Sequence, residues 1–198
     1  MITLALETST IRGSVAVSED GKTLFNEAFT ADRSHSSQLF VSLERVFAAV
    51  PRCDQIVVGL GPGSYSGVRI AISAAIGISL GSGSRLLGIS SIAAFDQREY
   101  VAIGDARRGA FYFSHVRDGE ILEGPTLLDR GALEEKIRAA SVAVIASEHI
   151  ENVAGHELLF PSADKLAHLA EQGRSIIARD KLEPIYLREP HITQPKKL

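Results

Sequence analysis

The chain of 198 residues is long enough to bury a hydrophobic core, because 45% of its side chains are apolar. Its formal charge of −3 gives no global attraction for nucleic acid, which a basic face or stripe would supply. The single cysteine, Cys53, excludes an intramolecular disulfide, and Met1 leads into a strand-like run instead of a basic and then apolar leader. No apolar run approaches the roughly 20 residues of a membrane span. These features predict a folded protein of the cytoplasm, with no contact to a membrane.

The N-terminal half alternates between strand and helix patterns. Short β-favouring runs bounded by turn residues predict strands over residues 2–6, 14–18, 23–30, 55–60 and 85–89, the first three forming one antiparallel meander. Helical spacing predicts helices over residues 35–49, with Ser34 as a candidate cap, and over residues 67–80. The apolar positions of the first helix are Leu39, Phe40, Leu43, Val46, Phe47 and Val50. The second helix carries small residues that let another backbone approach closely, namely Ala71, Ala74, Ala75 and Gly77.

The C-terminal half repeats this order in a shorter form. The predicted strands are residues 100–104, 110–116, 120–127 and 142–146, and the predicted helices are residues 129–140 and 163–179. The apolar face of the last helix comprises Leu166, Leu169, Ala170, Ile176 and Ile177. A meander followed by helix, strand, helix and strand is the order of a ribonuclease-H-like unit. The pattern therefore predicts two tandem α/β subdomains with mixed sheets, residues 1–98 and an abbreviated second unit over residues 99–198.

A glycine-rich segment connects the predicted strand over residues 55–60 to the second helix. It reads Gly59-Leu-Gly-Pro-Gly-Ser-Tyr-Ser-Gly67 and places four glycines ahead of a helix N-terminus. Unpaired N–H groups and the helix dipole at such a turn can receive an anion. The same glycines can also serve only to let the helix pack against the sheet, which is the commoner role of such turns. The segment is not a P-loop, because no Gly-Lys-Ser/Thr follows.

Residues 61–70, Gly-Pro-Gly-Ser-Tyr-Ser-Gly-Val-Arg-Ile, resemble the signature of the TsaB (YeaZ) family, in which an aromatic residue follows Gly-Pro-Gly-Ser. Other stretches match this family in the same order, namely residues 4–10 with 14–17, His35-Ser36 with Leu39, residues 105–109 and residues 184–188. The resemblance covers the first half densely and the second half sparsely. It implies the actin-like ATPase (ASKHA) fold and a protein that is the non-catalytic paralogue of TsaD.

The family resemblance also implies a function. It predicts a scaffold subunit that acts with TsaD and with the ATPase TsaE, in the transfer of threonylcarbamoyl to adenosine 37 of tRNAs that read codons beginning with A. ATP and metal would be used by the partner subunits, and tRNA would be reached only through the complex. In this family the first two helices pack against TsaD, or against a second copy of the chain when it is alone. The expected interface residues are His35, Gln38, Leu39, Ser42, Arg69, Ile70, Ser73, Ala74 and Gly77. A bulky charge at Ala74 or Ala75 is predicted to break this pair and leave the monomer folded.

A second set of residues corresponds to the nucleotide contacts of active actin-like proteins. It comprises Glu7, Thr8, Ser9 and Thr10 at the first turn and Asp105 at the start of the second half. Glu7 departs from the usual Asp by one methylene, and the hydroxyls can equally bond their own backbone. The second phosphate loop of such proteins needs glycines after its Asp, whereas Ala106, Arg107 and Arg108 follow here, and no Gly-Gly pair occurs in the sequence. We therefore expect no tightly bound cofactor.

No catalytic or metal site is predicted from the remaining residues. The six histidines include no pair separated by three residues, and no nucleophilic triad is evident. Two alternatives to the scaffold stay open. One is an independent ATP-binding or phosphotransfer protein that uses Glu7, the hydroxyls of residues 8–10 and Asp105. The other is an RNA-binding module, which the negative net charge and the sparse aromatic residues disfavour.

Overall fold

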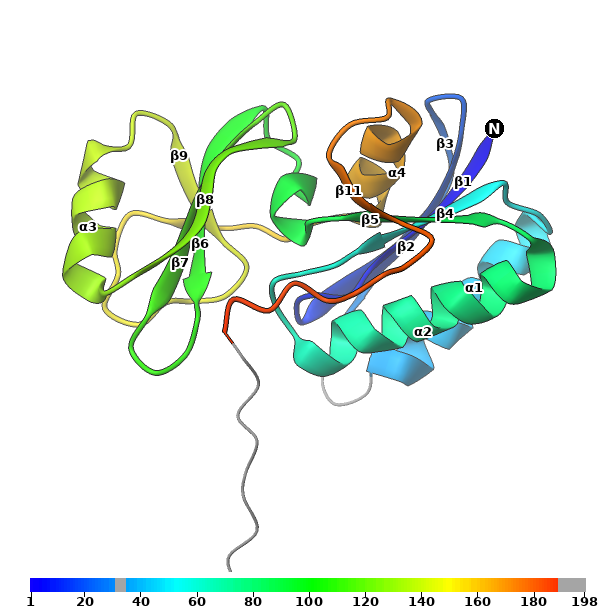
Figure 1. Cartoon of the computed structure of the whole chain (residues 1–198), viewed down its shortest axis with the longest axis horizontal. Coiled ribbons are helices and arrows are strands. Elements are labelled where there is room, and N and C mark those ends of the chain that lie inside the picture. The colour runs from blue at the N-terminus through cyan, green and yellow to red at the C-terminus, as the bar shows by residue number, and fades with distance from the viewer. Residues whose placement is uncertain (31–34, 189–198) are drawn as a thin grey trace, which may run out of the picture.

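The computed structural model describes residues 1–30 and 35–188, with side chains except those of His35 and Ser36. It contains two α/β lobes side by side (Figure 1). Within the described residues, the first lobe holds β1 (Ile2–Glu7), β2 (Arg12–Glu19), β3 (Lys22–Thr30), α1 (His35–Ala49), β4 (Gln55–Gly59), α2 (Tyr65–Ser82), β5 (Arg85–Ile89), α4 (Ala163–Glu171) and β11 (Ile176–Arg179). The second lobe holds β6 (Glu99–Asp105), β7 (Phe111–Arg117), β8 (Glu120–Leu128), α3 (Arg130–Ala139), β9 (Ala143–Ala146) and β10 (Glu157–Leu158). The short 3-10 helix η1 (Ser91–Ala94) leads from the first lobe to the second.

The two sheets share one topology. The first has the order β11-β5-β4-β1-β2-β3 and the second β10-β9-β6-β7-β8. In each, an antiparallel meander of three strands is extended from its first strand by a parallel strand, β4 on β1 and β9 on β6. The order 3-2-1-4-5 therefore occurs twice, and the two-residue β10 makes the second copy the shorter one. The predicted tandem repeat and the predicted strands are confirmed.

The central strands of the first sheet are buried on both faces. Leu4 and Leu6 of β1 face the core beneath α1 and α2, whereas Ala5 between them faces the core beneath α4. This alternation follows from the two-residue repeat of a strand. In the second lobe, α3 covers one face of the sheet through Leu133, which is fully buried. The loops that follow β1, β4 and β6 lie between the two lobes.

The C-terminal part of the chain departs from the prediction. The helix predicted over residues 163–179 ends at Glu171, and Ile176 and Ile177 lie on β11. Gly173 ends the helix in the left-handed region with φ of +69°, and Arg174 N–H donates to the Leu169 carbonyl at 2.9 Å. Leu166, Leu169 and Ala170 form the buried face as predicted.

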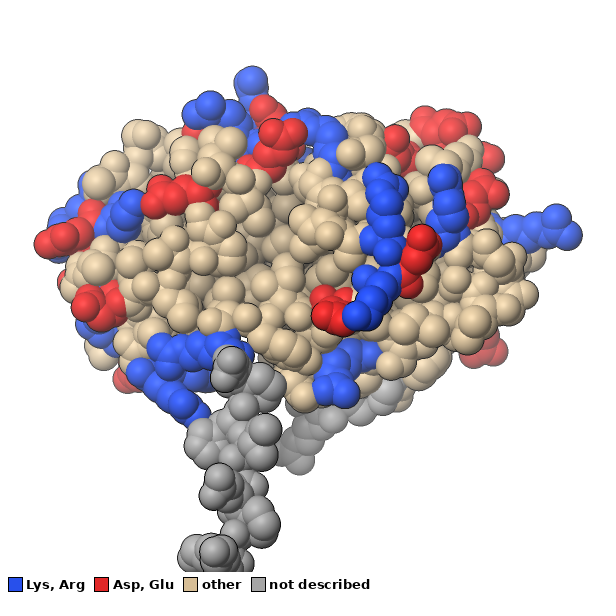
Figure 2. Space-filling model, in the orientation of Figure 1, with Lys and Arg blue, Asp and Glu red and all other residues tan. Residues whose placement is uncertain are grey.

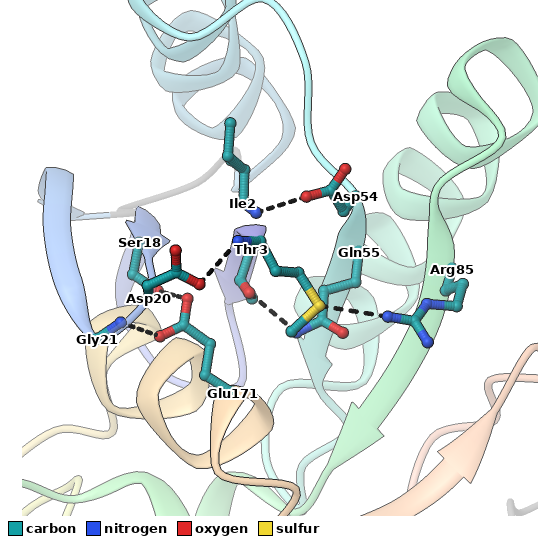
Figure 3. Close-up of polar contacts among 10 residues, drawn as sticks. Ile2, Thr3, Ser18, Asp20, Gly21, Asp54, Gln55, Arg85 and Glu171 are labelled. Atoms are coloured by element: carbon teal, nitrogen blue, oxygen red, sulfur yellow. Dashed lines mark hydrogen bonds and ion pairs between the residues drawn. The ribbon is translucent and has the colours of Figure 1, made fainter.

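The assignment of residues 163–179 to the second subdomain is wrong. β11 pairs antiparallel with β5, and α4 packs on the first sheet. Figure 3 shows Glu171 of α4 tied to the β2–β3 turn: its carboxylate accepts from Ser18 Oγ at 2.5 Å and from Gly21 N–H at 2.7 Å. The chain therefore leaves the first lobe through η1, builds the second lobe and returns. The apolar pattern alone could not show this return, because it fits either sheet.

Candidate functional site

The glycine-rich loop between β4 and α2 packs directly on the turn between β1 and β2. A Cβ on Gly63 would lie 2.1 Å from the Ser9 carbonyl oxygen, and one on Gly67 would lie 2.1 Å from the Thr8 carbonyl oxygen. Ser64 N–H donates to the Ser9 carbonyl at 2.6 Å, and Thr8 Oγ1 donates to the Gly67 carbonyl at 2.8 Å. The glycines thus provide close packing. The Ser64 N–H that would face an anion is already paired within the chain.

Glu7 lies beneath this turn and is completely buried. Its Oε1 accepts from Ser9 N–H at 2.6 Å and its Oε2 accepts from Ser91 Oγ at 2.7 Å. Burial of the charge raises the pKa of Glu7, and the hydrogen bond from Ser9 N–H opposes that shift in part. Gly59 makes room for the carboxylate, because a Cβ there would lie 1.9 Å from Oε2. Glu7 is therefore an internal link between the first turn and η1.

A cleft of about 840 Å³ separates the lobes. It brings together Ser9 and Thr10 from the first turn and Asp105 from the end of β6, whereas Glu7 and Thr8 do not line it. The Oγ of Ser9 is buried and has no hydrogen-bond partner within the part of the chain that the structure describes. Three of the five predicted nucleotide-contact residues thus share one cavity.

The Asp105 side of the cleft is filled with paired charges. Arg107 N–H donates to Asp105 Oδ1 at 2.6 Å, and Arg107 Nη1 donates to Oδ2 at 3.3 Å. Asp105 N–H donates to Glu148 Oε1 at 3.1 Å, so a second carboxylate sits at the same place. Two carboxylates repel a phosphate, and the backbone N–H of Asp105 is not free to bind one. Among residues 1–30 and 37–188, no group of three or more His, Cys, Asp or Glu side chains is placed to hold a metal ion.

A second surface lies on the outer face of α1 and α2. In α2 the exposed positions Arg69, Ser73 and Gly77 follow each other at four-residue spacing, and Arg69 is the helix's one charged residue. Among the residues that the structure describes, none places an atom within 4 Å of a Cβ built on Gly77, so the backbone there is open to an approaching partner. Figure 2 shows the corresponding region largely free of charged side chains. We refer to this surface as the helical face.

Large apolar side chains are exposed on the helical face. Leu80 is 83% exposed, Phe40 55%, Val41 42% and Ile76 39%. The sequence prediction missed all four, and it placed Phe40 on the buried side of α1. A helical wheel centred on the fully buried Leu39 would have found Phe40 and Val41, because they lie about 100° and 200° away from it. Such a set of exposed apolar side chains, next to small residues, is typical of an interaction surface.

Several residues predicted for the interface point into the chain's own core. Leu39, Ser42 and Ala74 are buried, and Ile70 is half-buried against the same core. Gln38 is exposed with the residues of the helical face, and the side chain of His35 lies outside the described residues, as does the proposed cap Ser34. The helices lie where the sequence predicts them. The predicted interface, however, includes residues of their buried side, each next in sequence to an exposed one.

Two stacked aromatic residues join the helical face to the cleft. Tyr65, the first residue of α2, stacks on Tyr186 with ring centroids 5.4 Å apart and an interplanar angle of 28°. Arg69 lies over the Tyr65 ring at 5.0 Å and donates to its hydroxyl. Both tyrosines also line the cleft. The matched stretch over residues 184–188 pointed to this segment, but nothing in the sequence indicated which residues it touches.

The repeated 3-2-1-4-5 sheet and the cleft between the two copies define an α/β protein of the actin-like (ASKHA) class, built from ribonuclease-H-like units. The family model described as TsaD, tRNA N6-adenosine threonylcarbamoyltransferase, matches residues 29–181. The chain belongs to this family, in its TsaB (YeaZ) branch.

Relatives and solved structures agree with this placement. The protein described as tRNA threonylcarbamoyladenosine biosynthesis protein TsaB of Haemophilus influenzae is 29% identical, over 93% of this chain and 92% of its own length. The protein of the same description from Escherichia coli is 25% identical, over 93% of this chain and 94% of its own. The structure of YeaZ from Pseudomonas aeruginosa has a TM-score of 0.71 at 22% identity, covering 94% of this chain and 99% of that one. A structure described as similar to peptidase YeaZ, from the same organism, has a TM-score of 0.75 at 23% identity and the same coverage.

Proposed function

We propose that this chain is a scaffold subunit in the biosynthesis of threonylcarbamoyladenosine in tRNA. Its catalytic partner would be TsaD, with TsaE as the ATPase of the complex, and threonylcarbamoyl would pass to adenosine 37 of tRNAs that read codons beginning with A. The family match supports the pathway, since TsaB relatives are described as biosynthesis proteins for this nucleoside. The chain would reach tRNA only as part of the complex. No helix within residues 1–30 and 35–188 is long and apolar enough to cross a membrane.

The helical face is the observation that carries the scaffold role. Leu80 is largely exposed, and covering such an apolar side chain with a partner favours binding by roughly 25 cal/mol per Å² of apolar area. Gly77 leaves the backbone of α2 accessible beside it, so a partner helix would pack at short range. We propose TsaD as the occupant, because it is a paralogue with matching helices. In its absence the same face would bind a second copy of the chain, by a two-fold arrangement.

The cleft supports a non-catalytic role. Asp105 is paired with Arg107, Glu148 adds a second carboxylate, and Glu7 is buried away from the cavity. Phosphoryl chemistry needs positive groups around the phosphates and a metal ion between them. Next to Asp105, the positive group Arg107 is paired with that carboxylate, and among the described residues no cluster of three or more His, Cys, Asp or Glu is placed to hold a metal ion. We therefore propose that ATP and metal act in the partner subunits.

The prediction that a bulky charge at Ala74 or Ala75 leaves the monomer folded is wrong, because both residues are buried in the core. The docking experiment therefore uses exposed positions. Ser73→Arg places a long charged side chain on the helical face, and Ala139→Arg on α3 is the matched control on the second lobe. The expected result is loss of co-purification with TsaD for Ser73→Arg and unchanged co-purification for Ala139→Arg, with wild-type melting temperatures for both. Retention of TsaD by Ser73→Arg would contradict the proposed interface.

The pathway is tested separately from the interface. Depletion of the chain in cells, followed by mass spectrometry of tRNA nucleosides, is expected to lower threonylcarbamoyladenosine. Complementation with wild type or Ala139→Arg should restore the nucleoside, whereas Ser73→Arg should not. An unchanged amount of the nucleoside after depletion would contradict the proposed function as a whole.

One observation favours the alternative of an ATP-binding protein. The unpaired hydroxyl of Ser9 lines the cleft with Thr10 and Asp105, as a nucleotide contact would. Calorimetry of the isolated chain with ATP and magnesium separates the two functions. We expect no heat of binding at millimolar ATP. Saturable binding that is lost in Ser9→Ala would favour the alternative.

A further inference from the structure

The segment that follows β11 crosses the open side of the cleft. Residues 182–188, which we name the strap, run from the first lobe to the mouth of the cleft (Figure 1). Leu182 is buried and Ile185 is half-buried in the core beneath α1 and α2. Two residues further on, Leu187 packs against the hydrophobic cluster that contains Tyr100 and Tyr112 of the second lobe. One short segment is therefore anchored in both lobes.

The strap is fixed to the first lobe by two kinds of contact. Ile185 N–H donates to the Leu60 carbonyl at 2.8 Å, directly after β4. Tyr186 stacks on Tyr65, at the start of α2. Tyr186 is 43% exposed, so its ring adds a lateral contact and is not part of the core. Removal of this ring should loosen the strap without unfolding either lobe.

Other contacts also join the lobes. The chain returns from β10 to α4 through residues 159–162, where Phe160 lines the cleft and Arg12 of the first lobe lies over its ring at 5.8 Å. η1 connects the lobes covalently, and Tyr100 Oη of the second lobe donates to the Ile92 carbonyl at 2.7 Å. The turn between β7 and β8 packs on the first lobe close to α4, where Ser175 Oγ donates to the Gly119 carbonyl at 2.7 Å. These contacts would act as a hinge. The strap is a further connection, which reaches from the first lobe along the mouth of the cleft.

We propose that the strap is a latch that holds the two lobes closed over the cleft. Its two anchors, Ile185 and Leu187, restrain rotation about the hinge formed by η1, residues 159–162 and the β7–β8 turn. Because Tyr186 stacks on the first residue of α2, the latch also ties the angle between the lobes to the helical face. When a protein docks on α2 beside Tyr65, the latch has already fixed the orientation of the helical face relative to the second lobe.

The test measures the distance between the lobes in the isolated chain. Spin labels are attached at Ala48→Cys on α1 and Ala139→Cys on α3, two exposed positions, in a Cys53→Ser background. Pulsed electron resonance then gives the distribution of distances between the lobes for wild type, Tyr186→Ala, Tyr186→Phe and Leu187→Ala. Leu122→Ala, an exposed apolar position on β8 away from the strap, is the control.

We expect a broader and longer distribution for Tyr186→Ala and Leu187→Ala, and the wild-type distribution for Tyr186→Phe and Leu122→Ala. Hydrogen exchange at the Ile185 amide should accelerate roughly two- to tenfold in Tyr186→Ala, as the loss of one stacked aromatic pair implies. Unchanged distances in both strap variants would overturn the latch, even with faster exchange at Ile185. Neither result depends on TsaD, so the latch and the scaffold function fail independently.

Discussion

Glu7 is the residue for which the structure most changes the expected role, and its replacement is the sharpest test. As a ligand for metal or phosphate, its carboxylate would need to reach the cleft. In the structure it is buried and accepts hydrogen bonds from Ser9 N–H and Ser91 Oγ. Two replacements separate the roles. Glu7→Gln keeps the shape and removes the charge, whereas Glu7→Ala removes both hydrogen-bond acceptors.

The magnitude follows from the two donors. Each buried donor left without an acceptor costs about 1–3 kcal/mol, so Glu7→Ala should lose roughly 2–6 kcal/mol of the free energy of unfolding. Relief of the buried charge returns part of this cost. In Glu7→Gln, Oε1 can still accept from Ser9 N–H and the amide can donate to Ser91 Oγ. We therefore expect Glu7→Gln to be at least as stable as wild type at neutral pH.

The dependence on pH adds an independent check. The folded pKa of Glu7 is raised above its usual 4.5 because burial disfavours the charge. A raised acid pKa means that the folded state favours the protonated carboxyl, so its stabilisation is present below pH 4.5 and is lost as the pH rises through the folded pKa. Relative to Glu7→Gln, wild type should lose stability from pH 4.5 upwards.

Urea unfolding followed by circular dichroism at several pH values measures all three effects. Glu7→Ala within about 1 kcal/mol of wild type would refute the structural role, since it would mean that the two donors find other partners. Equal destabilisation by Glu7→Gln and Glu7→Ala would show that the negative charge itself is required. That result would return Glu7 to the list of candidate ligands.

Three further changes test other parts of the structure. Gly77→Ala should raise the free energy of unfolding by about 1 kcal/mol, because alanine favours a helix. The added methyl group is expected to weaken binding of TsaD at the proposed interface, and Gly131→Ala on α3 is the matched control. Unchanged affinity for TsaD would remove Gly77 from the proposed interface. Gly119→Ala should cost about 1–3 kcal/mol in urea unfolding, because its φ is +80° and its Cβ would lie 2.5 Å from a side chain of α4, and a neutral effect would contradict that packing. Arg117 lowers the pKa of Glu99 to about 2, so the stabilisation by Glu99 is present above pH 4.5 and is lost as the pH falls towards 2. Thermal melts of wild type and Glu99→Gln should converge over that range, and parallel curves would exclude this ion pair as the cause.

Most of the fold could be predicted because its elements are local and strongly periodic. The meander of the first sheet, the two helices beside it and the shortened second copy follow from apolar spacing and turn residues. The end of α4 could not be predicted, because the sequence after Glu171 keeps apolar residues at helical spacing, and Gly173 alone marks the break. The return of β11 to the first sheet depends on pairing with β5, far away in the sequence. Such pairing leaves no local signal.

The sequence predicts the residues of the candidate sites. The structure shows which of them are buried in the core and which are accessible to a ligand or partner. Ser9 and Asp105 share the cleft as a superfamily comparison implies, but Glu7 does not, because Gly59 leaves a space for its carboxylate inside the lobe. On the helical face, Leu39 marks the buried side of α1 and Phe40 the exposed side. A difference of one residue rotates a helix by about 100°, so a list taken from a motif alone includes both faces.

The contacts of the glycine-rich loop connect the two surfaces. The family resemblance implies that, in an active actin-like protein, the turn after the first strand of each meander leaves backbone groups open to phosphate; here these are the turns after β1 and after β6. In this chain the first of these turns is covered by its own neighbours, since Ser64 N–H binds the Ser9 carbonyl and Thr8 Oγ1 binds the Gly67 carbonyl. The same bonds fix the start of α2 to the first sheet. Two donors that could bind an anion, the Ser64 N–H and the Thr8 hydroxyl, are thus used to hold the start of α2 against the first sheet, as the proposed scaffold role would require.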